Sequence, residues 1–310
     1  MTLRGWAGFM ALAIGISHPA WAAGSDEDWK RCIGNTPEVS IEGCSAVIKA
    51  GEDQGETLAA AYANRAAAYQ AQGALDRALQ DYDKAIELKP KDGDIFDSRG
   101  LAYRAQGQLD RAIKDFDQAV ALNPKLGPAF ADRGRAYHAK GQYDRAMMDY
   151  DLALNLNPFS AEVINARGRT NFAAGRFPAA AEDFARSLGV AIDPYATIWL
   201  HLSQARAKAD DATDLAANAA KADPDAWPGP VISYFLKKKT AEEVLAAANT
   251  GDDTAKTSQN CEAAFFLGED ALARQKSTEA EKLLRQASTT CPPDFEEFEA
   301  AAAELRHFGK

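Results

Sequence analysis

The chain has 310 residues, 45 acidic and 35 basic side chains, and a formal net charge of −10 at neutral pH. Its only basic run is Lys237–Lys239, which argues against nucleic acid as a partner because phosphates require clustered lysine and arginine. The chain is rich in helical patterns, and no segment shows the alternation of a β-strand. These features predict an all-α protein.

The N-terminus has the features of an export signal. Arg4 precedes an apolar stretch, Trp6–Ile16, and Ala20–Ala22 places small residues where a signal peptidase cleaves. The stretch is shorter than the roughly 20 residues of a membrane-spanning helix. The first cysteine is Cys32, which does not follow the cleavage point as lipid attachment requires. We therefore predict a cleaved signal at residues 1–22 and a periplasmic protein that is secreted but not lipidated.

A short helical hairpin is predicted next, in residues 23–58. Its helices are Trp29–Cys32 and Val39–Lys49, joined around Gly34–Asn35. Because stacked repeats need an end unit that covers their apolar face, we interpret this hairpin as an N-terminal cap.

Residues 59–194 repeat with a period of 34 residues, which predicts four units. Each unit has small residues at its eighth and twentieth positions, an aromatic at its twenty-fourth, and in three units a proline at its thirty-second. These residues are Ala66, Gly100, Gly134 and Gly168; Ala78, Ala112, Ala146 and Ala180; Tyr82, Phe116, Tyr150 and Phe184; and Pro90, Pro124 and Pro158. This pattern is typical of the tetratricopeptide repeat (TPR), a helix–turn–helix unit. Its small residues let the two helices approach closely, and its proline ends the second helix. We expect a right-handed solenoid of stacked units with first helices lining a concave groove.

Residues 195–310 are predicted to be degenerate, TPR-like C-terminal helices. The expected elements are Tyr195–Arg206, Asp210–Lys221, Val231–Phe235, Ala241–Ala248, a terminal unit at 261–294, and a capping helix at Asp294–His307. Two prolines, Pro228 and Pro230, exclude a continuous helix between the second and third of these.

Four cysteines in an exported chain favour disulfide bonds. Position suggests two local pairs, Cys32 with Cys44 and Cys261 with Cys291. The other pairings would join opposite ends of a solenoid. Two pairs of buried free thiols are the alternative.

Two charged positions recur in all four units. Position seven holds Arg65, Arg99, Arg133 and Arg167, and position twenty-three holds Asp81, Asp115, Asp149 and Asp183. One hypothesis makes the arginine row a binding stripe, and the other makes the two rows a ladder of mutual ion pairs. We favour the ladder, since residues that recur in every unit usually serve the scaffold.

Residues that bind a partner should vary between units, because a ligand is not periodic. The variable residues expected to line the groove are Asn64, Gln70, Asp97, Arg104, Asp132, Arg135, His138, Asn165, Arg169 and Phe172. Among them, Arg104, Arg135 and Arg169 are predicted to form a stripe that binds an acidic segment or a chain terminus, because guanidinium groups bind carboxylates bidentately. A solvated groove with unused arginines is the alternative.

No catalytic or cofactor-binding motif is recognisable in the chain. The histidines after the signal, His138, His201 and His307, lie in separate units without metal-ligand spacing. The nucleophile motifs and phosphate-binding glycine loops of known enzyme classes do not occur. We therefore predict a protein that is not an enzyme, with no cofactor and no metal.

The part after Gly168 resembles one family more closely than a generic repeat protein. It contains Ile198–Leu202, Trp227, Val231–Phe235 and Phe265–Gly268 in an order similar to the NlpI-type TPR proteins of the bacterial envelope. The resemblance covers about residues 59–308 and implies a scaffold that brings a tail-specific protease to peptidoglycan hydrolases. Members are lipoproteins whose N-terminal segment takes part in dimer formation, whereas this chain lacks a lipid-attachment site and carries a cysteine-bearing hairpin there. A homodimer therefore stays open.

Two functions follow as hypotheses. In the first, the protein is a non-catalytic adaptor whose groove holds one partner protein. In the second, it is a periplasmic assembly factor that holds many exported clients, as a chaperone does.

Overall fold

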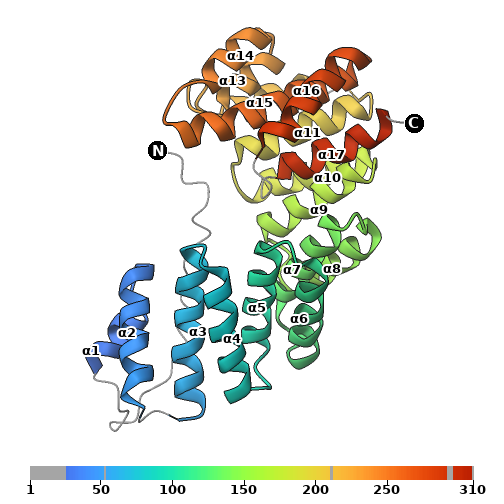
Figure 1. Cartoon of the computed structure of the whole chain (residues 1–310). Helices are drawn as coiled ribbons and strands as arrows, with labels where there is room; N and C mark the ends of the chain where they lie inside the picture. The colour runs from blue at the N-terminus through green and yellow to red at the C-terminus, as the bar shows by residue number, and fades with distance from the viewer. Residues whose placement is uncertain (1–25, 52–53, 210–211, 292–295, 309–310) are drawn as a thin grey trace. The chain divides into compact units, whose positions relative to one another are not determined.

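The computed structural model describes residues 26–51, 54–209, 212–291 and 296–308. Within these residues it contains seventeen helices and no strand, so the predicted all-α fold is confirmed. Contacts divide the chain into two compact units, Met1–Lys140 and Gly141–Lys310. Figure 1 shows the helices of both units in chain order.

The first unit is a run of antiparallel helices, each packed on the next. They are α1 (Asp26–Cys32), α2 (Pro37–Ala50), α3 (Glu56–Ala71), α4 (Leu75–Leu88), α5 (Gly93–Ala105), α6 (Leu109–Leu122) and α7 (Gly127–Ala139). Helices α2 to α5 lie side by side in Figure 1. Gly73 and Gly107 turn the chain between paired helices with φ of 72°, a conformation that glycine adopts without steric cost.

The second unit begins with α8, continues with the helix pair α9–α10, and then becomes less regular. Its helices are α8 (Tyr143–Leu156), α9 (Ala161–Ala173), α10 (Phe177–Val190), α11 (Pro194–Arg206), α12 (Ala212–Ala219), α13 (Gly229–Phe235), α14 (Ala241–Ala248), α15 (Asp253–Ala273), α16 (Ser277–Thr290) and α17 (Glu296–Phe308). Helix α15 packs against α11, α14, α16 and α17.

Two boundaries in the second unit differ from the sequence prediction. The terminal unit was expected to start at Cys261, but α15 begins eight residues earlier at Asp253, where the Asp252 carboxylate accepts a hydrogen bond from the Ala255 amide. The segment that precedes Cys261 is polar and has no apolar periodicity, so only this N-cap indicates the helix. Helix α17 begins at Glu296, and its predicted start at Asp294 lies outside the described residues.

The core of the second unit is built around Trp199 of α11. Its ring contacts Phe172 of α9 at 5.1 Å between centroids, Phe184 of α10 at 5.9 Å, and Phe265 and Phe266 of α15 at 5.5 and 6.0 Å. All five rings are at most 4% exposed. Four helices therefore share one aromatic cluster, which holds the irregular part of this unit against its regular helix pair.

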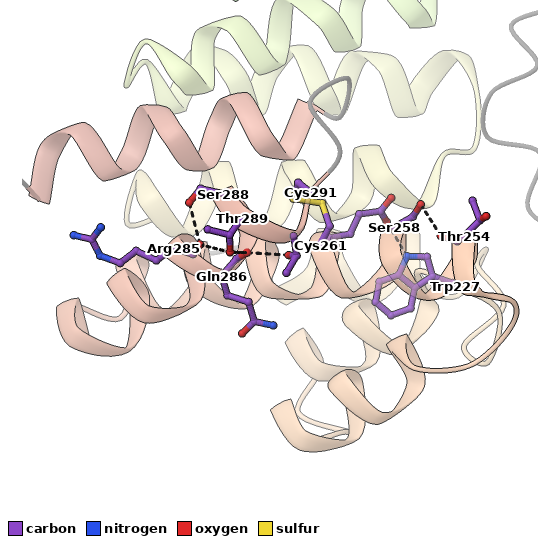
Figure 2. The surroundings of a disulfide bond; sticks show 11 residues. Trp227, Thr254, Ser258, Cys261, Arg285, Gln286, Ser288, Thr289 and Cys291 are labelled. Atoms are coloured by element: carbon purple, nitrogen blue, oxygen red, sulfur yellow. Dashed lines mark hydrogen bonds between the residues drawn. A yellow bond between two sulfur atoms is a disulfide. The ribbon is translucent and has the colours of Figure 1, made fainter. Parts of the chain in front are cut away.

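Both predicted cysteine pairs are disulfide-bonded in the structure. Cys32 at the end of α1 pairs with Cys44 of α2, with 4.3 Å between Cα atoms. Cys261 pairs with Cys291, which directly follows α16, with 4.7 Å between Cα atoms (Figure 2). Cys261 lies in the third turn of α15 rather than at the start of its helix. None of the described cysteines is a free thiol.

No described helix combines the length and the apolar composition that crossing a bilayer requires.

Candidate protein-binding surface

The recurring arginines form an ion-pair ladder. The Arg65 guanidinium donates two hydrogen bonds to Asp81, at 2.7 and 2.8 Å, and Arg99 donates two to Asp115 at the same distances. Arg167 is paired with Asp183 in the same way. The three aspartates are at most 6% exposed, so each arginine neutralises a buried carboxylate of its own repeat. The ladder hypothesis is supported over the binding stripe.

The same arginines also join each repeat to the preceding one. Arg99 reaches back to Asp83 at 2.6 Å, Arg133 to Asp117 at 2.8 Å and Arg167 to Asp151 at 2.6 Å. In the first repeat, Ser45 of the preceding hairpin takes this place and accepts a bond from Arg65 at 3.1 Å. These aspartates were not predicted from the sequence, although they also recur every 34 residues.

Seven of the predicted groove residues lie in the first unit, each on the first helix of a repeat. Asn64 and Gln70 are on α3, Asp97 and Arg104 on α5, and Asp132, Arg135 and His138 on α7. Helix α5 contacts both α3 and α7. We call the seven residues the first-helix face. The Tyr82 hydroxyl, on the buried side, donates to the Gln70 side chain at 3.2 Å.

Two aspartates are buried within the first-helix face. Asp97 is 9% exposed and Asp132 is 7% exposed. Asp132 accepts a hydrogen bond from Arg135 of its own helix at 2.7 Å, whereas Oδ1 of Asp97 has no hydrogen-bond partner. Burial raises the pKa of the Asp97 carboxyl well above its ordinary value, and the charges of Asp132 and Asp94 add to the shift, while Arg135 and Arg104 oppose it.

Arg104 also has an unsatisfied polar atom. Its Nε is buried and makes no hydrogen bond. A buried donor or acceptor without a partner costs about 1–3 kcal/mol, and in native proteins such atoms need an explanation. On one face of α5, the acceptor of Asp97 and the donor of Arg104 are both unsatisfied. Both atoms have almost no accessible surface, so a polypeptide segment on this face can contact Arg104 only through the other atoms of its half-buried side chain.

The other three predicted groove residues lie on α9 in the second unit. Asn165 donates to the Asp193 carboxylate at 3.2 Å, and Arg169 is half-buried. Phe172 was expected to line the groove, but it is only 3% exposed. That prediction is wrong because Trp199, from a helix beyond the regular repeats, packs edge-on against the ring.

The described histidine side chains, His138 and His201, lie on different helices. His138 is half-buried on α7, and the His201 ring lies against Phe235 with 4.2 Å between centroids. The side chain of His307 lies outside the described part of the chain. Among the described residues, no three histidine, cysteine or carboxylate side chains are grouped as metal ligands would be.

Two buried glutamates of α15 were not predicted as functional or structural residues. Glu262 accepts hydrogen bonds from the Tyr195 hydroxyl at 2.8 Å and from the Trp227 indole at 2.7 Å. Glu269 accepts one from Arg206 at 2.5 Å, and Arg206 also reaches Glu304 at 3.3 Å. Burial, and then the charge of Glu304, raises the pKa of Glu269 to about 8. Each glutamate has a partner within the second unit, although Oε1 of Glu269 makes no hydrogen bond, and we interpret both as internal links between helices.

Comparison with known proteins agrees with the repeat register. Residues 59–92, 98–126 and 128–160 match models of the tetratricopeptide repeat. No curated protein matches the chain. The chain therefore contains tetratricopeptide repeats, which generally mediate protein–protein interactions in a scaffold that is typically non-catalytic.

Solved structures show a similar fold. The pilF protein of Pseudomonas aeruginosa is 14% identical with a TM-score of 0.50, and the match covers 79% of this chain and 97% of that protein. The C-terminal part of a TPR protein from Cytophaga hutchinsonii is also 14% identical with a TM-score of 0.50, covering 85% and 94%. At these identities the likeness shows the fold, an all-α tetratricopeptide solenoid, and not the function.

Proposed function

We propose that this protein is a non-catalytic adaptor that binds another protein through the first-helix face of its first unit. The observation that carries the proposal is the group of charges that Arg104 and Arg135 form with the buried Asp97 and Asp132, on a face of a fold that generally binds proteins. Burial raises the pKa of the Asp97 carboxyl, so the ionised form of this group is destabilised in the folded chain. A role in binding explains why such a group occupies this position.

The chemistry of the face defines the partner segment. Arg104 is suited to a carboxylate of the partner, from an acidic side chain or a chain terminus. Arg135 supports the site through Asp132, because their ion pair at 2.7 Å balances the second buried carboxylate.

An exported location accompanies this proposal. The N-terminal pattern of residues 1–22 supports it, and two disulfide bonds support an oxidising compartment such as the periplasm. The order of motifs from Ile198 to Gly268 resembles NlpI-type proteins. On that resemblance, the partners we propose to look for first are an envelope protease and a peptidoglycan hydrolase.

The test is affinity capture from an envelope extract, with the purified chain immobilised and bound proteins quantified by mass spectrometry. We expect one partner at near-stoichiometric yield. The double variant Arg104→Ala with Asp97→Asn should lose most of that capture. The matched control is Arg111→Ala, which removes an exposed arginine of α6 whose guanidinium donates to Gln108 at 2.9 Å. The control should capture as the wild type does.

Two results would overturn the proposal. A broad set of clients without a dominant protein would favour the client-holding alternative. Equal capture by the wild type and a folded double variant would place the binding surface elsewhere. Circular dichroism of each variant separates lost binding from lost folding.

A further inference from the structure

Helix α17 contacts more of the second unit than the end of its helix stack. A helix that only capped the solenoid would contact the last helix pair, α15 and α16. Helix α17 contacts both of these, and it also contacts α9, although α10 to α16 separate the two helices along the chain. Its Glu304 carboxylate accepts a hydrogen bond from Arg206 of α11 at 3.3 Å. Helix α17 therefore lies against α9, α11 and α15, each the first helix of a pair (Figure 1).

One face of α17 carries these contacts. Ala301 is fully buried in the core of the second unit, and Leu305 and Phe308 are partly buried against the same core. The Glu304 side chain is 14% exposed. The four residues have the spacing i, i+3, i+4 and i+7, by which an amphipathic helix binds in the apolar groove of another protein. Helix α17 thus packs on the second unit as a bound helical ligand would.

The surface under α17 holds one cation among aromatic rings. The Arg206 guanidinium lies over the Phe177 ring, 4.4 Å from its centroid, and over the Phe172 ring at 5.7 Å. It also donates a hydrogen bond to the fully buried Glu269 at 2.5 Å. These contacts hold Arg206 in place without any help from α17. The guanidinium is therefore preorganised to bind a carboxylate from a helix that packs on this surface.

The described side chains attach α17 less firmly than α16. Four consecutive residues of α17, Ala300–Ala303, are alanines, which bury little apolar area. Helix α16 instead buries Leu284 completely, and the disulfide bond between Cys261 and Cys291 joins its end to α15 (Figure 2). Helix α17 follows Cys291 in the chain, so the bond keeps α15 and α16 together when α17 is displaced.

We propose that the surface of α9, α11 and α15 under α17 is a second protein-binding site, whose partner is an amphipathic helix with one carboxylate, and that α17 covers this site in the free chain. The partner helix displaces α17 because it presents the same pattern, with its carboxylate on Arg206 and its larger apolar residues in place of Leu305 and Phe308. The covered site shares no residue with the first-helix face, so either proposal can fail alone. While α17 covers the site, partner binding remains with the first-helix face.

The first test uses a fluorescently labelled peptide with the sequence of α17, Glu296–Phe308, and the chain from residue 23 onward. In the open variant, Leu305→Asp with Phe308→Asp, the attached helix loses its two larger apolar contacts. We expect the open variant to bind the peptide at least about 10-fold more tightly than the wild type does, because α17 occupies the site in the wild type. Fluorescence polarisation measures both affinities.

Two matched controls define what the peptide binds. Arg306→Asp introduces an aspartate on the exposed side of the same helix, and this variant should bind the peptide as weakly as the wild type does. A peptide with the change Glu304→Lys should not bind the open variant, since it brings a second cation to Arg206. Equal binding of the two peptides would contradict the role of Arg206, and tight binding by the Arg306→Asp variant would contradict the role of the apolar contacts.

Hydrogen exchange of the unmodified chain tests the opening of α17 itself. Amides of α17 should exchange at least about 10-fold faster than those of α16, because α17 opens locally. Saturating unlabelled peptide should increase the α17 rate further, since it competes for the covered site. An α17 rate that equals that of α16 or ignores the peptide would overturn the proposal. So would a folded open variant that does not bind the peptide, or an open variant that circular dichroism shows to be unfolded, because α17 would then belong to the scaffold.

Discussion

The first unit and the C-terminal helices α11 to α17 are stabilised by different kinds of contact. In the first unit, the ladder arginines bind aspartates 16 residues away, both in their own repeat and in the preceding one. In the C-terminal helices, Tyr195 binds Glu262 at a separation of 67 residues, Arg206 binds Glu269 at 63 and Trp227 binds Glu262 at 35. Local repetition holds one region together, and distant polar and aromatic contacts hold the other.

This difference determines where function can be placed. In the first unit the scaffold contacts occupy recurring positions, so the remaining residues of the first helices can vary, and there Asp97 and Arg104 retain unsatisfied atoms. In the C-terminal helices, the buried carboxylates Glu262, Glu269 and Asp270 of α15 each accept hydrogen bonds from residues outside that helix, although Oε1 of Glu269 has no partner. We therefore assign partner binding to the first unit and an internal structural role to the buried glutamates.

The largest expected effect comes from the disulfide of the C-terminal helices. Removing it with Cys261→Ser and Cys291→Ser should lower the free energy of unfolding by about 3–4 kcal/mol, because the bond closes a loop and restricts the unfolded chain. Removing the Cys32–Cys44 bond should cost about 3 kcal/mol, since its sequence separation is 12 rather than 30 residues. Urea unfolding under non-reducing conditions measures both. A larger loss for the shorter loop would contradict the comparison.

The ladder should be the next most sensitive feature. Arg99→Met leaves the buried Asp115 without its counter-charge, and we expect a loss of about 3 kcal/mol. The matched control is Arg285→Met on α16, because Arg285 and Glu281 form an exposed pair, with side chains 65% and 39% exposed. An exposed pair contributes about 0–1 kcal/mol. Thermal unfolding of the two variants should differ clearly, and equal midpoints would show that the ladder is not structural.

Close helix packing predicts a third, smaller difference. A Cβ added at Gly100 would lie 2.6 Å from the Phe116 ring, whereas one added at Gly268 would lie 3.0 Å from the more flexible Leu284. Overpacking costs about 1–3 kcal/mol, so we expect Gly100→Ala near the upper end and Gly268→Ala near the lower end. Chemical denaturation of both variants checks the order. A neutral Gly100→Ala would contradict the assigned register.

A further prediction concerns the dependence of stability on pH. In the folded protein the pKa of Glu269 is raised from its ordinary value of 4.5 to about 8. The folded state therefore binds more protons than the unfolded state in this window, and the stability due to this group falls as pH rises from about 4.5 to 8. Glu269→Gln cannot ionise and should flatten this dependence. Unfolding at pH 5.5 and pH 8 measures it, and an unchanged slope would contradict the assignment.

Sequence periodicity predicted the repeat helices because each contact in them recurs at a fixed spacing. It also predicted the ladder and both disulfides, since their partners hold fixed positions in a repeat or a hairpin. It placed Phe172 wrongly because the residue that covers it, Trp199, lies outside the regular repeats. The buried Glu262 and Glu269 were missed for the same reason, since nothing local to α15 identifies Tyr195, Trp227 or Arg206 as partners.

Site-specific photocrosslinking tests the proposed adaptor role most directly. A photoreactive amino acid at Asn64 of α3 lies on the first-helix face, and the same amino acid at Lys114 lies on the exposed side of α6. After irradiation in the producing cells, we predict a single crosslinked partner from position 64 and none from position 114. Crosslinks from position 114 alone, or the same products from both positions, would contradict the assignment of partner binding to the first-helix face.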